Sequence, residues 1–576
     1  MGLELKQNEL FLKKAYNKAL LPCVLSVLSG SINILADGIL VGQKLGTNAL
    51  AAINFSLPVY LVLCIAGSFI VSGTAVRASD AIGKNRSGQA QELYGMAVFW
   101  CTAAAVLITV SGLVFLKPLS LALCSDENVR PLVAEYSGVT IAGALPKILI
   151  YIPFWFLRLD GRNGQVTLMM LIMGAGNVIL DALFLYTFDM GVSGAALASV
   201  LATAAACVSG FARLCDKKSG FQFGFRIKAK GAAFSEVARA GSPSAANNLF
   251  QTLRVTVINA LLLSYCGSET VAAFTAVNCI CAFAESVTGG VPQAASAMLG
   301  IYSGEHDNES ARLLIKRQLK SGIPWAAAFS AVIISGADLI SRAYGLNISL
   351  RFAFICLSFG MIPALINCIL SGFYNVSGRN IWANFIIFLR VFSASCASLF
   401  LLLDFGHSPW LFLFFGEMAT LIFWFAATGI FHRQSSRFLL LDTSLEHSGK
   451  VINFSVNGDA ESICNASGKI TDFCADNGMS PKQTMRISLA LEEIMTLISV
   501  KNKSAAGFDL RVYSLQVVIG IRIRYGGNEF NPLLYADNDE EYLGIRLIEG
   551  MCEQTLYQRT FGTNTVQIFV EGGVCA

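Results

Sequence analysis

Charged side chains are scarce in this sequence. Lys, Arg, Asp and Glu together make up 14% of the 576 residues, whereas hydrophobic residues make up 54%. A soluble domain carries about 25% charged residues, and one water-facing fold cannot bury so much apolar surface. The composition therefore excludes an ordinary soluble protein and indicates an integral membrane protein.

Histidine and closely paired cysteine are also scarce. The chain has four His, and none lies in the middle of an apolar run, which argues against a histidine proton relay across the bilayer. Its 16 Cys are scattered without a CxxC pair, so neither a zinc site nor a redox motif is indicated. The net charge of +4 is too small to suggest nucleic-acid binding.

Long apolar runs are abundant. A membrane-spanning helix needs about 20 mainly apolar residues. No cleavage site of the small-x-small kind precedes the first run, so we expect a retained helix rather than a signal peptide. The runs predict twelve spans, at about 18–41, 51–77, 94–116, 132–157, 164–187, 191–213, 241–264, 270–300, 321–341, 350–376, 382–404 and 408–431.

The basic residues predict the orientation of these spans. Lys and Arg concentrate in the N-terminal segment and the even-numbered loops and are sparse in the odd-numbered loops. Because cytoplasmic loops carry the excess of Lys and Arg, we expect a multi-pass membrane protein with both termini in the cytoplasm.

Two short motifs recur between the halves. Residues 45–52 resemble residues 266–273, and residues 160–163 resemble residues 377–380; their glycines are 221 and 217 positions apart. The near-equal separations indicate a duplicated six-helix unit, the usual build of a secondary transporter. The predicted organisation is a first lobe at 1–215, a linker at 216–240 and a second lobe at 241–432.

The sequence after Phe431 has no run that is long and apolar enough to span a membrane. We expect a linker at 433–447 and one cytoplasmic domain at 448–576. Residues 451–456 and 510–524 alternate as strands do, and residues 460–477 and 482–500 have helical periodicity. The predicted fold is therefore an all-α membrane protein of twelve helices with an α+β tail.

Ionisable residues within the predicted spans are few. Each costs about 2.5–3.5 kcal/mol at a helix centre and is a functional candidate by default. We expect Lys147 and Arg390 each to belong to a buried ion pair or to extend the side chain to the membrane–water interface. We expect Arg254 to neutralise a nearby carboxylate. The full set is Asp37, Lys147, Asp181, Arg254, Glu285, Arg390 and Glu417.

Asp37 and Asp181 are the best candidates for binding a coupling cation. They occur at similar depth in spans 1 and 5, and Asn177 precedes Asp181 by four residues, so the two share a helix face. Their oxygens suit Na⁺, or a proton held between two carboxylates, since one close carboxylate raises the pKa of the other. The equivalent second-half positions are Ile258 and Ser398, so this site belongs to the first half alone.

The membrane part resembles the MATE (multidrug and toxic compound extrusion) family over about residues 10–431. The resemblance rests on residues 33–42 (NILADGILVG), 50–52 (LAA), 81–84 (AIGK), 158–161 (RLDG) and 191–198 (GVSGAALA). It implies two six-helix lobes that export substrates by alternating access, driven by Na⁺ or H⁺. It also implies a first-lobe cation site of Asp37, Asn177, Asp181 and Ser199, and a second-lobe acid at Glu285, beside Arg254.

The tail resembles GHKL ATPases, especially anti-sigma-factor serine kinases, over about residues 448–571. The matching segments are 486–497 (RISLALEEIMTL), 521–533 (IRIRYGGNEFNPL) and 543–548 (LGIRLI). The resemblance implies a helix layer on a mixed sheet, with Glu493 as the counterpart of the general base.

The tail departs from this family at the nucleotide site. The family's Mg²⁺-binding Asn is Leu497 here, its adenine-binding Asp is Tyr525, and the glycine-rich lid is reduced to Gly544 and its neighbour, with Gly527 in the second motif. We therefore expect 448–576 to fold without binding ATP and Mg²⁺, and to serve as a regulatory or docking domain for a protein partner.

The predicted function is cation-coupled export of amphipathic, cationic small molecules, with membrane lipid around the spans. No enzymatic activity and no cofactor other than the coupling ion are expected. Two alternatives remain at this stage. A flippase for a lipid-linked sugar would need a cationic cavity, which Lys147, Arg254 and Arg390 could supply; a receptor would sense a ligand through the spans and signal through the tail.

Overall fold

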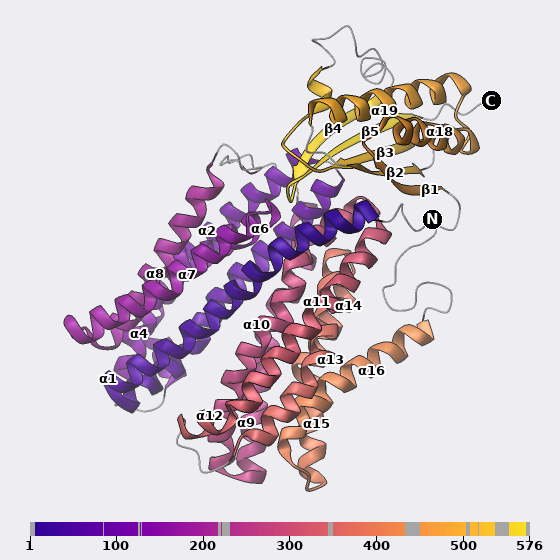
Figure 1. The fold of residues 1–576 in the computed structure, drawn as a ribbon. Coiled ribbons are helices and arrows are strands. Elements are labelled where there is room, and N and C mark those ends of the chain that lie inside the picture. The colour runs from indigo at the N-terminus through magenta and orange to yellow at the C-terminus, as the bar shows by residue number, and fades with distance from the viewer. Residues whose placement is uncertain are drawn as a thin grey trace. The chain divides into compact units, whose positions relative to one another are not determined.

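The chain folds into two compact units. A computed structural model describes residues 6–84, 86–124, 127, 129–216, 221, 231–343, 349–431, 450–502, 507–515, 518–535 and 552–571. The membrane unit consists of residues 18–307 and 314–431, and the tail unit consists of residues 1–17, 308–313 and 432–576. Figure 1 shows helices throughout the membrane unit and a sheet with two helices in the tail unit.

The first half of the membrane unit begins with one very long helix. Its elements are α1 (Lys6–Gly83), α2 (Ser87–Val114), α3 (Leu116–Leu123), α4 (Arg130–Ala142), α5 (Ala144–Leu149), α6 (Tyr151–Leu159), α7 (Asn163–Ala182), the π-helical turn η1 (Leu183–Thr187) and α8 (Gly191–Leu214). The helices α2, α4, α5, α6 and α7 pack around α8 and one another.

The second half is built around α10 and α13. Its elements are α9 (Gly231–Cys266), α10 (Ser268–Gly304), α11 (Asn308–Ser335), α12 (Ala337–Ala343), α13 (Arg351–Val376), α14 (Asn380–Ile387), the π-helical turn η2 (Phe388–Ser393), α15 (Ala394–Asp404), the short η3 (Pro409–Leu411) and α16 (Phe412–Phe431). Buried Ile258, Phe274, Phe354 and Leu399 bring α9, α10, α13 and α15 into one core.

Ten of the twelve predicted spans coincide with helices that are apolar and long enough to cross a membrane. Nine such helices lie among the described residues, and α4 with α5–α6 forms a tenth pass if this pair, bent by 60°, is one span. The predicted span 18–41 lies within α1, and the predicted span 321–341 falls on α11 and α12. The loop predicted at 42–50 is wrong, because α1 is helical through this stretch; the helix also continues through Pro22 and Pro58.

The turn before α7 recurs before α14. Gly161 and Gly378 have φ of 74° and 75°, a left-handed conformation that favours glycine. Their amides donate to the carbonyls of Arg158 and Asn375, three residues earlier, and the helices α7 and α14 begin two residues later. The two halves therefore share a local structure at the positions where their sequences match.

The ends of α1 and α10 meet at two glycines. A Cβ on Gly83 would lie 2.2 Å from the Ile301 carbonyl oxygen, and a Cβ on Gly304 would lie 2.4 Å from the Asp80 carbonyl oxygen. Each of these Cβ atoms would also lie 3.0 Å from the other glycine's Cα. Gly83 and Gly304 are 221 positions apart, as are the glycines of the first repeated motif, so equivalent residues of the two halves face each other.

The tail is a five-stranded sheet with two helices on one face (Figure 1). Its elements are β1 (Val451–Asn457), α18 (Ala460–Asp476), α19 (Pro481–Lys501), β2 (Gly507–Leu515), β3 (Val518–Tyr525), the short η4 (Pro532–Tyr535), β4 (Cys552–Thr560) and β5 (Thr563–Glu571). The strand order is β1-β2-β3-β5-β4. Residues predicted as one strand region at 510–524 form the hairpin of β2 and β3.

Every strand pair in this sheet is antiparallel, so the predicted mixed sheet is wrong. The two helices α18 and α19 connect β1 to its neighbour β2, and this pair is antiparallel as well. The two helices were correctly predicted: Asp459 and Ser480 accept hydrogen bonds from the first-turn amides of α18 and α19, and the apolar faces of both helices pack on the sheet.

Candidate functional site

A cavity of about 420 Å³ lies between the two halves of the membrane unit. Side chains from α1 and α6 line one side, and side chains from α9, α10, α13 and η2 line the other. An interlobe hydrogen bond borders it, from Asn248 Nδ2 to Ser68 Oγ at 3.3 Å. Side chains of both halves therefore line the cavity, as alternating access requires.

One wall of the cavity is aromatic and the rest is mostly polar. Tyr151, Phe154 and Trp155 come from α6 of the first half. The opposite wall carries amides, hydroxyls and two charged side chains, namely Ser244, Asn247, Asn248, Gln251, Glu285, Thr288, Gln293, Ser296, Ser371, Asn375 and Arg390. Such a surface can stack on a flat ring and offer hydrogen bonds to its edges.

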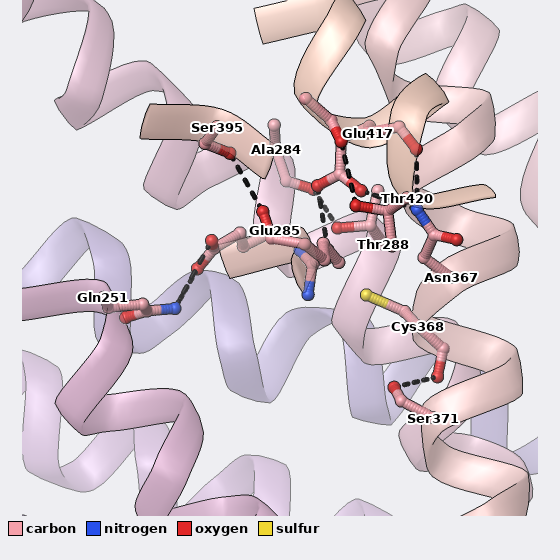
Figure 2. Close-up of polar contacts among 12 residues, drawn as sticks. Gln251, Ala284, Glu285, Thr288, Asn367, Cys368, Ser371, Ser395, Glu417 and Thr420 are labelled. Carbon is pink, nitrogen blue, oxygen red and sulfur yellow. Dashed lines mark hydrogen bonds and ion pairs between the residues drawn. The ribbon is translucent and has the colours of Figure 1, made fainter. Parts of the chain in front are cut away.

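The charged side chains of the second half form a polar network (Figure 2). Glu285 on α10 accepts from Gln251 Nε2 at 3.2 and 3.4 Å. Glu417 on α16 accepts from Arg390 Nε at 2.8 Å and from Asn367 Nδ2 at 2.9 Å. Arg390 and Glu417 are thus a largely buried ion pair, and Arg390 also lines the cavity.

Arg254 lies beside this network without pairing with its acids. It lines a smaller pocket together with Glu285, Arg390 and Glu417. Among the described residues, Arg254 forms no ion pair with Glu285, and its buried Nε has no hydrogen-bond partner. Arg254 was expected to neutralise a carboxylate, but among the described residues it forms no ion pair in this conformation.

The first half brings together two of its four predicted cation ligands. Asn177 Nδ2 donates to Asp181 Oδ2 at 2.5 Å on α7, and the two residues are 1% and 0% exposed. Ser199 on α8 instead accepts a hydrogen bond from Lys147 Nζ at 2.9 Å. Asp37 lies in α1, but its side chain lies outside the described part of the structure.

Lys147 is buried close to this pair of helices. Its ammonium lies 5.4 Å from the centre of the Tyr60 ring and donates to Ser199. Ser199 therefore accepts a hydrogen bond from an amine in this conformation. The role predicted for Ser199 in cation coupling stays a prediction.

Sequence reasoning missed several polar groups of the second half. The sequence identifies Glu417 and Arg390 as intramembrane charges, and the buried pair expected for Arg390 is confirmed, with Glu417 as the partner that the sequence does not name. Nothing in the sequence marks Asn367 or Gln251. Their contacts join α9, α10, α13, η2 and α16, which are distant in sequence. The only sequence signal was the occurrence of opposite charges in separate apolar runs.

Two of the five tail positions named above are core residues. Leu497 and Tyr525 are each 0% exposed and belong to the core between helices and sheet. The Tyr525 hydroxyl donates to the Phe530 carbonyl at 2.6 Å, and burial raises the pKa of Tyr525 well above its usual value, so the donor stays protonated. Glu493 is partly buried on α19, Gly527 has a φ of 91°, and Gly544 lies outside the described residues.

Comparison with known proteins places the membrane part in one family. The MatE family model matches residues 22–187. Residues 22–187 therefore form a MatE family domain. The fold agrees: a multidrug resistance MATE family transporter solved in an outward-facing conformation superposes with a TM-score of 0.68 at 20% identity, covering 73% of this chain and 96% of that chain.

Similar curated proteins are bacterial transporters. A protein named FAD transporter from Shewanella oneidensis is 27% identical over 281 residues, which cover 47% of this chain and 62% of that protein. Probable multidrug resistance protein YoeA of Bacillus subtilis is 24% identical over 53% of this chain and 66% of its own length. The matched part of the chain thus spans 62% and 66% of the length of these two relatives.

Proposed function

We propose that this protein is a secondary exporter that moves small organic molecules across the bacterial plasma membrane in exchange for Na⁺ or H⁺. The observation that carries the proposal is the cavity between the two halves, lined by side chains of both. Rocking of one six-helix lobe against the other would expose such a cavity to each side of the membrane in turn.

The coupling ion is assigned to the first lobe. Asn177 and Asp181 form a buried polar pair on α7, and Asp37 lies on the neighbouring α1. A carboxylate buried in a membrane protein is costly unless it binds a partner. Binding of Na⁺ or a proton at Asp181 would neutralise its charge and couple ion binding to the lobe's conformation.

The substrate is assigned as an aromatic molecule with polar edges. Tyr151, Phe154 and Trp155 offer ring surfaces, and the amides of the second half offer both donors and acceptors. Glu285 favours a positively charged group in the substrate. A relative named FAD transporter is consistent with an aromatic cargo.

The alternative of a lipid-linked sugar flippase has less support. It needs a cationic cavity, but Arg390 is paired with Glu417, and Glu285 lies on the same wall. Lys147 donates to Ser199 and is not among the residues lining the cavity.

The tail is proposed to be a regulatory domain that does not bind nucleotide. Leu497 offers no oxygen to a metal ion, and the Tyr525 hydroxyl is already used within the fold. The folded core that remains provides a surface on which a protein partner could dock.

Everted membrane vesicles test the proposed function. Uptake of a fluorescent aromatic cation such as ethidium is measured under an imposed Na⁺ gradient or an imposed H⁺ gradient, with full-length and tail-deleted protein. We expect one gradient to drive uptake and a gradient-collapsing ionophore to stop it. Equal dye movement in vesicles without the protein would contradict the proposal.

A further inference from the structure

Arg158 is a buried cation with an incomplete set of partners. This α6 residue is 4% exposed. Its Nη2 donates to Ser26 Oγ at 2.7 Å, and its guanidinium carbon lies 3.9 Å from the centre of the Phe154 ring. The buried Nε and Nη1 atoms have no hydrogen-bond partner among the residues that the structure describes.

A small cavity adjoins this guanidinium. Its volume is about 20 Å³, and it is lined by Arg158 together with Ser79, Trp155, Gln293 and Ser296 and four apolar residues. About 10–15 Å³ is enough for one water molecule, so the space suits a single small particle. The buried side-chain oxygen of Gln293 also has no hydrogen-bond partner among the described residues.

The small cavity lies between the cavity of about 420 Å³ described above, here called the central cavity, and the contact of Gly83 with Gly304. It shares Trp155, Gln293 and Ser296 with the central cavity. Along α1 its lining residues run from Ala75 to Ser79, and Gly83 follows one turn later. Along α10 they run from Gln293 to Ala297, followed by Gly304.

The chemistry of the site favours an anion over water. A water molecule would accept a hydrogen bond from Nε or Nη1 but would leave the buried positive charge uncompensated. Removing an unpaired charge from water costs several kcal/mol even after relaxation. The stacking on Phe154 recovers only part of this cost, whereas a monovalent anion would satisfy both nitrogens with charge-assisted hydrogen bonds.

We propose that Arg158 binds a halide ion, chloride in the cell, in the small cavity between the two lobes. Arg158 donates from Nε and Nη1, and the Ser296 hydroxyl and the Gln293 amide, turned to present its NH₂ group, complete the site. The volume of about 20 Å³ suits one small ion.

A bound halide would stabilise the conformation in which α1 and α10 are packed together. The site is made of residues from both halves, Arg158 from the first and Gln293 and Ser296 from the second. Separation of the lobes at Gly83 and Gly304 would hydrate Arg158 and release the ion. Chloride is therefore a ligand of one conformational state, not a transported substrate.

Thermal unfolding of the purified full-length protein tests the site without measuring transport. The midpoint is compared in about 150 mM sodium chloride, bromide and gluconate at constant ionic strength, and we expect it to rise by about 2 °C or more in either halide. Arg158→Gln should abolish this rise, and Arg158→Lys should retain part of it. The control is Arg351→Gln, at an exposed residue at the start of α13, which should leave the rise unchanged.

Crystals of the wild-type protein grown in bromide give a direct second measurement, which also covers poor expression of the Arg158→Gln variant. An anomalous peak beside Arg158 Nε is expected. Identical midpoints in chloride and gluconate, an undiminished rise in a folded Arg158→Gln variant, or the absence of the anomalous peak would each overturn the proposal.

Discussion

Single buried polar residues carry most of the proposed mechanism. The four-residue spacing of Asn177 and Asp181 predicts their contact, and the structure shows it as a hydrogen bond. Glu417, Asn367 and Arg390 could not be grouped from the sequence, because their helices meet only through tertiary packing. Local spacing therefore predicts contacts within a helix but not between helices.

Replacing Asp181 with Asn should uncouple export from the ion gradient. The amide keeps the size of the carboxylate but cannot take up a proton or neutralise Na⁺. We expect gradient-driven dye transport to fall by about tenfold or more, the range of typical coupling free energies. Transport in vesicles, normalised to inserted protein, measures the effect.

Asp189→Asn is the matched control for this substitution. Asp189 carries the same carboxylate but is exposed, where it pairs with Lys44 at 3.1 Å, so its loss should leave coupled transport unchanged. Wild-type flux from a well-inserted Asp181→Asn variant would show that the coupling site lies elsewhere.

The Arg390–Glu417 pair should be coupled in stability. Arg390→Gln leaves the buried Glu417 carboxylate without its cation, which costs about 3–5 kcal/mol when a buried pair is broken. The Arg390→Gln/Glu417→Gln double variant removes both charges and should recover most of this loss. Thermal unfolding midpoints of the two single variants and the double variant measure the coupling; additive losses would show that the pair contributes little.

At the scale of elements, the sequence predicts the helices and their order better than the connections between them. Apolar run length locates ten of the spans, because crossing a membrane requires that length. The continuity of α1 through 42–50 could not be predicted, since it depends on what packs against that stretch. The antiparallel sheet of the tail was likewise missed, because alternation identifies strands but not their direction.

The crossing of α1 and α10 should not tolerate a side chain at Gly83. In Gly83→Val, the added Cβ would approach the Ile301 carbonyl oxygen to 2.2 Å, which forces the helix ends apart. We expect a loss of about 1–3 kcal/mol of stability, typical of overpacking, together with slower transport. The unfolding midpoint and the initial rate of dye uptake measure the two effects.

Gly88→Val, near the start of α2, is the control for this substitution, because a Cβ there has no atom within 4 Å. It should leave both quantities close to those of the wild type. Full stability and transport in Gly83→Val would mean that the two helices do not stay packed at this point during the cycle.

At the scale of the whole molecule, the chain joins a MATE membrane part to a folded tail. The sequence resemblance predicts the family of the membrane part, which the comparisons confirm. The GHKL resemblance of the tail stays a prediction. Its adenine and metal positions are held by Tyr525 and Leu497, and both contribute to the hydrophobic core.

The full-length protein should therefore not bind ATP and Mg²⁺ measurably. Leu497 cannot orient the metal ion, and Tyr525 is buried in the core and has no carboxylate to accept hydrogen bonds from adenine. Each lost polar contact costs about 1–3 kcal/mol, and every 1.4 kcal/mol is a factor of ten in affinity. Calorimetric titration measures it, and a dissociation constant of about 1 μM would show a working nucleotide site.

The central claim is that substrate and cation movements are obligatorily exchanged. Purified protein in liposomes without nucleotide is given an outward gradient of ethidium, and the opposing movement of H⁺ or Na⁺ is followed with a dye for each ion. We predict that efflux of ethidium drives inward movement of one of the two ions, and that Asp181→Asn abolishes this ion movement. Ethidium efflux through the wild-type protein with neither ion moving would contradict the claim.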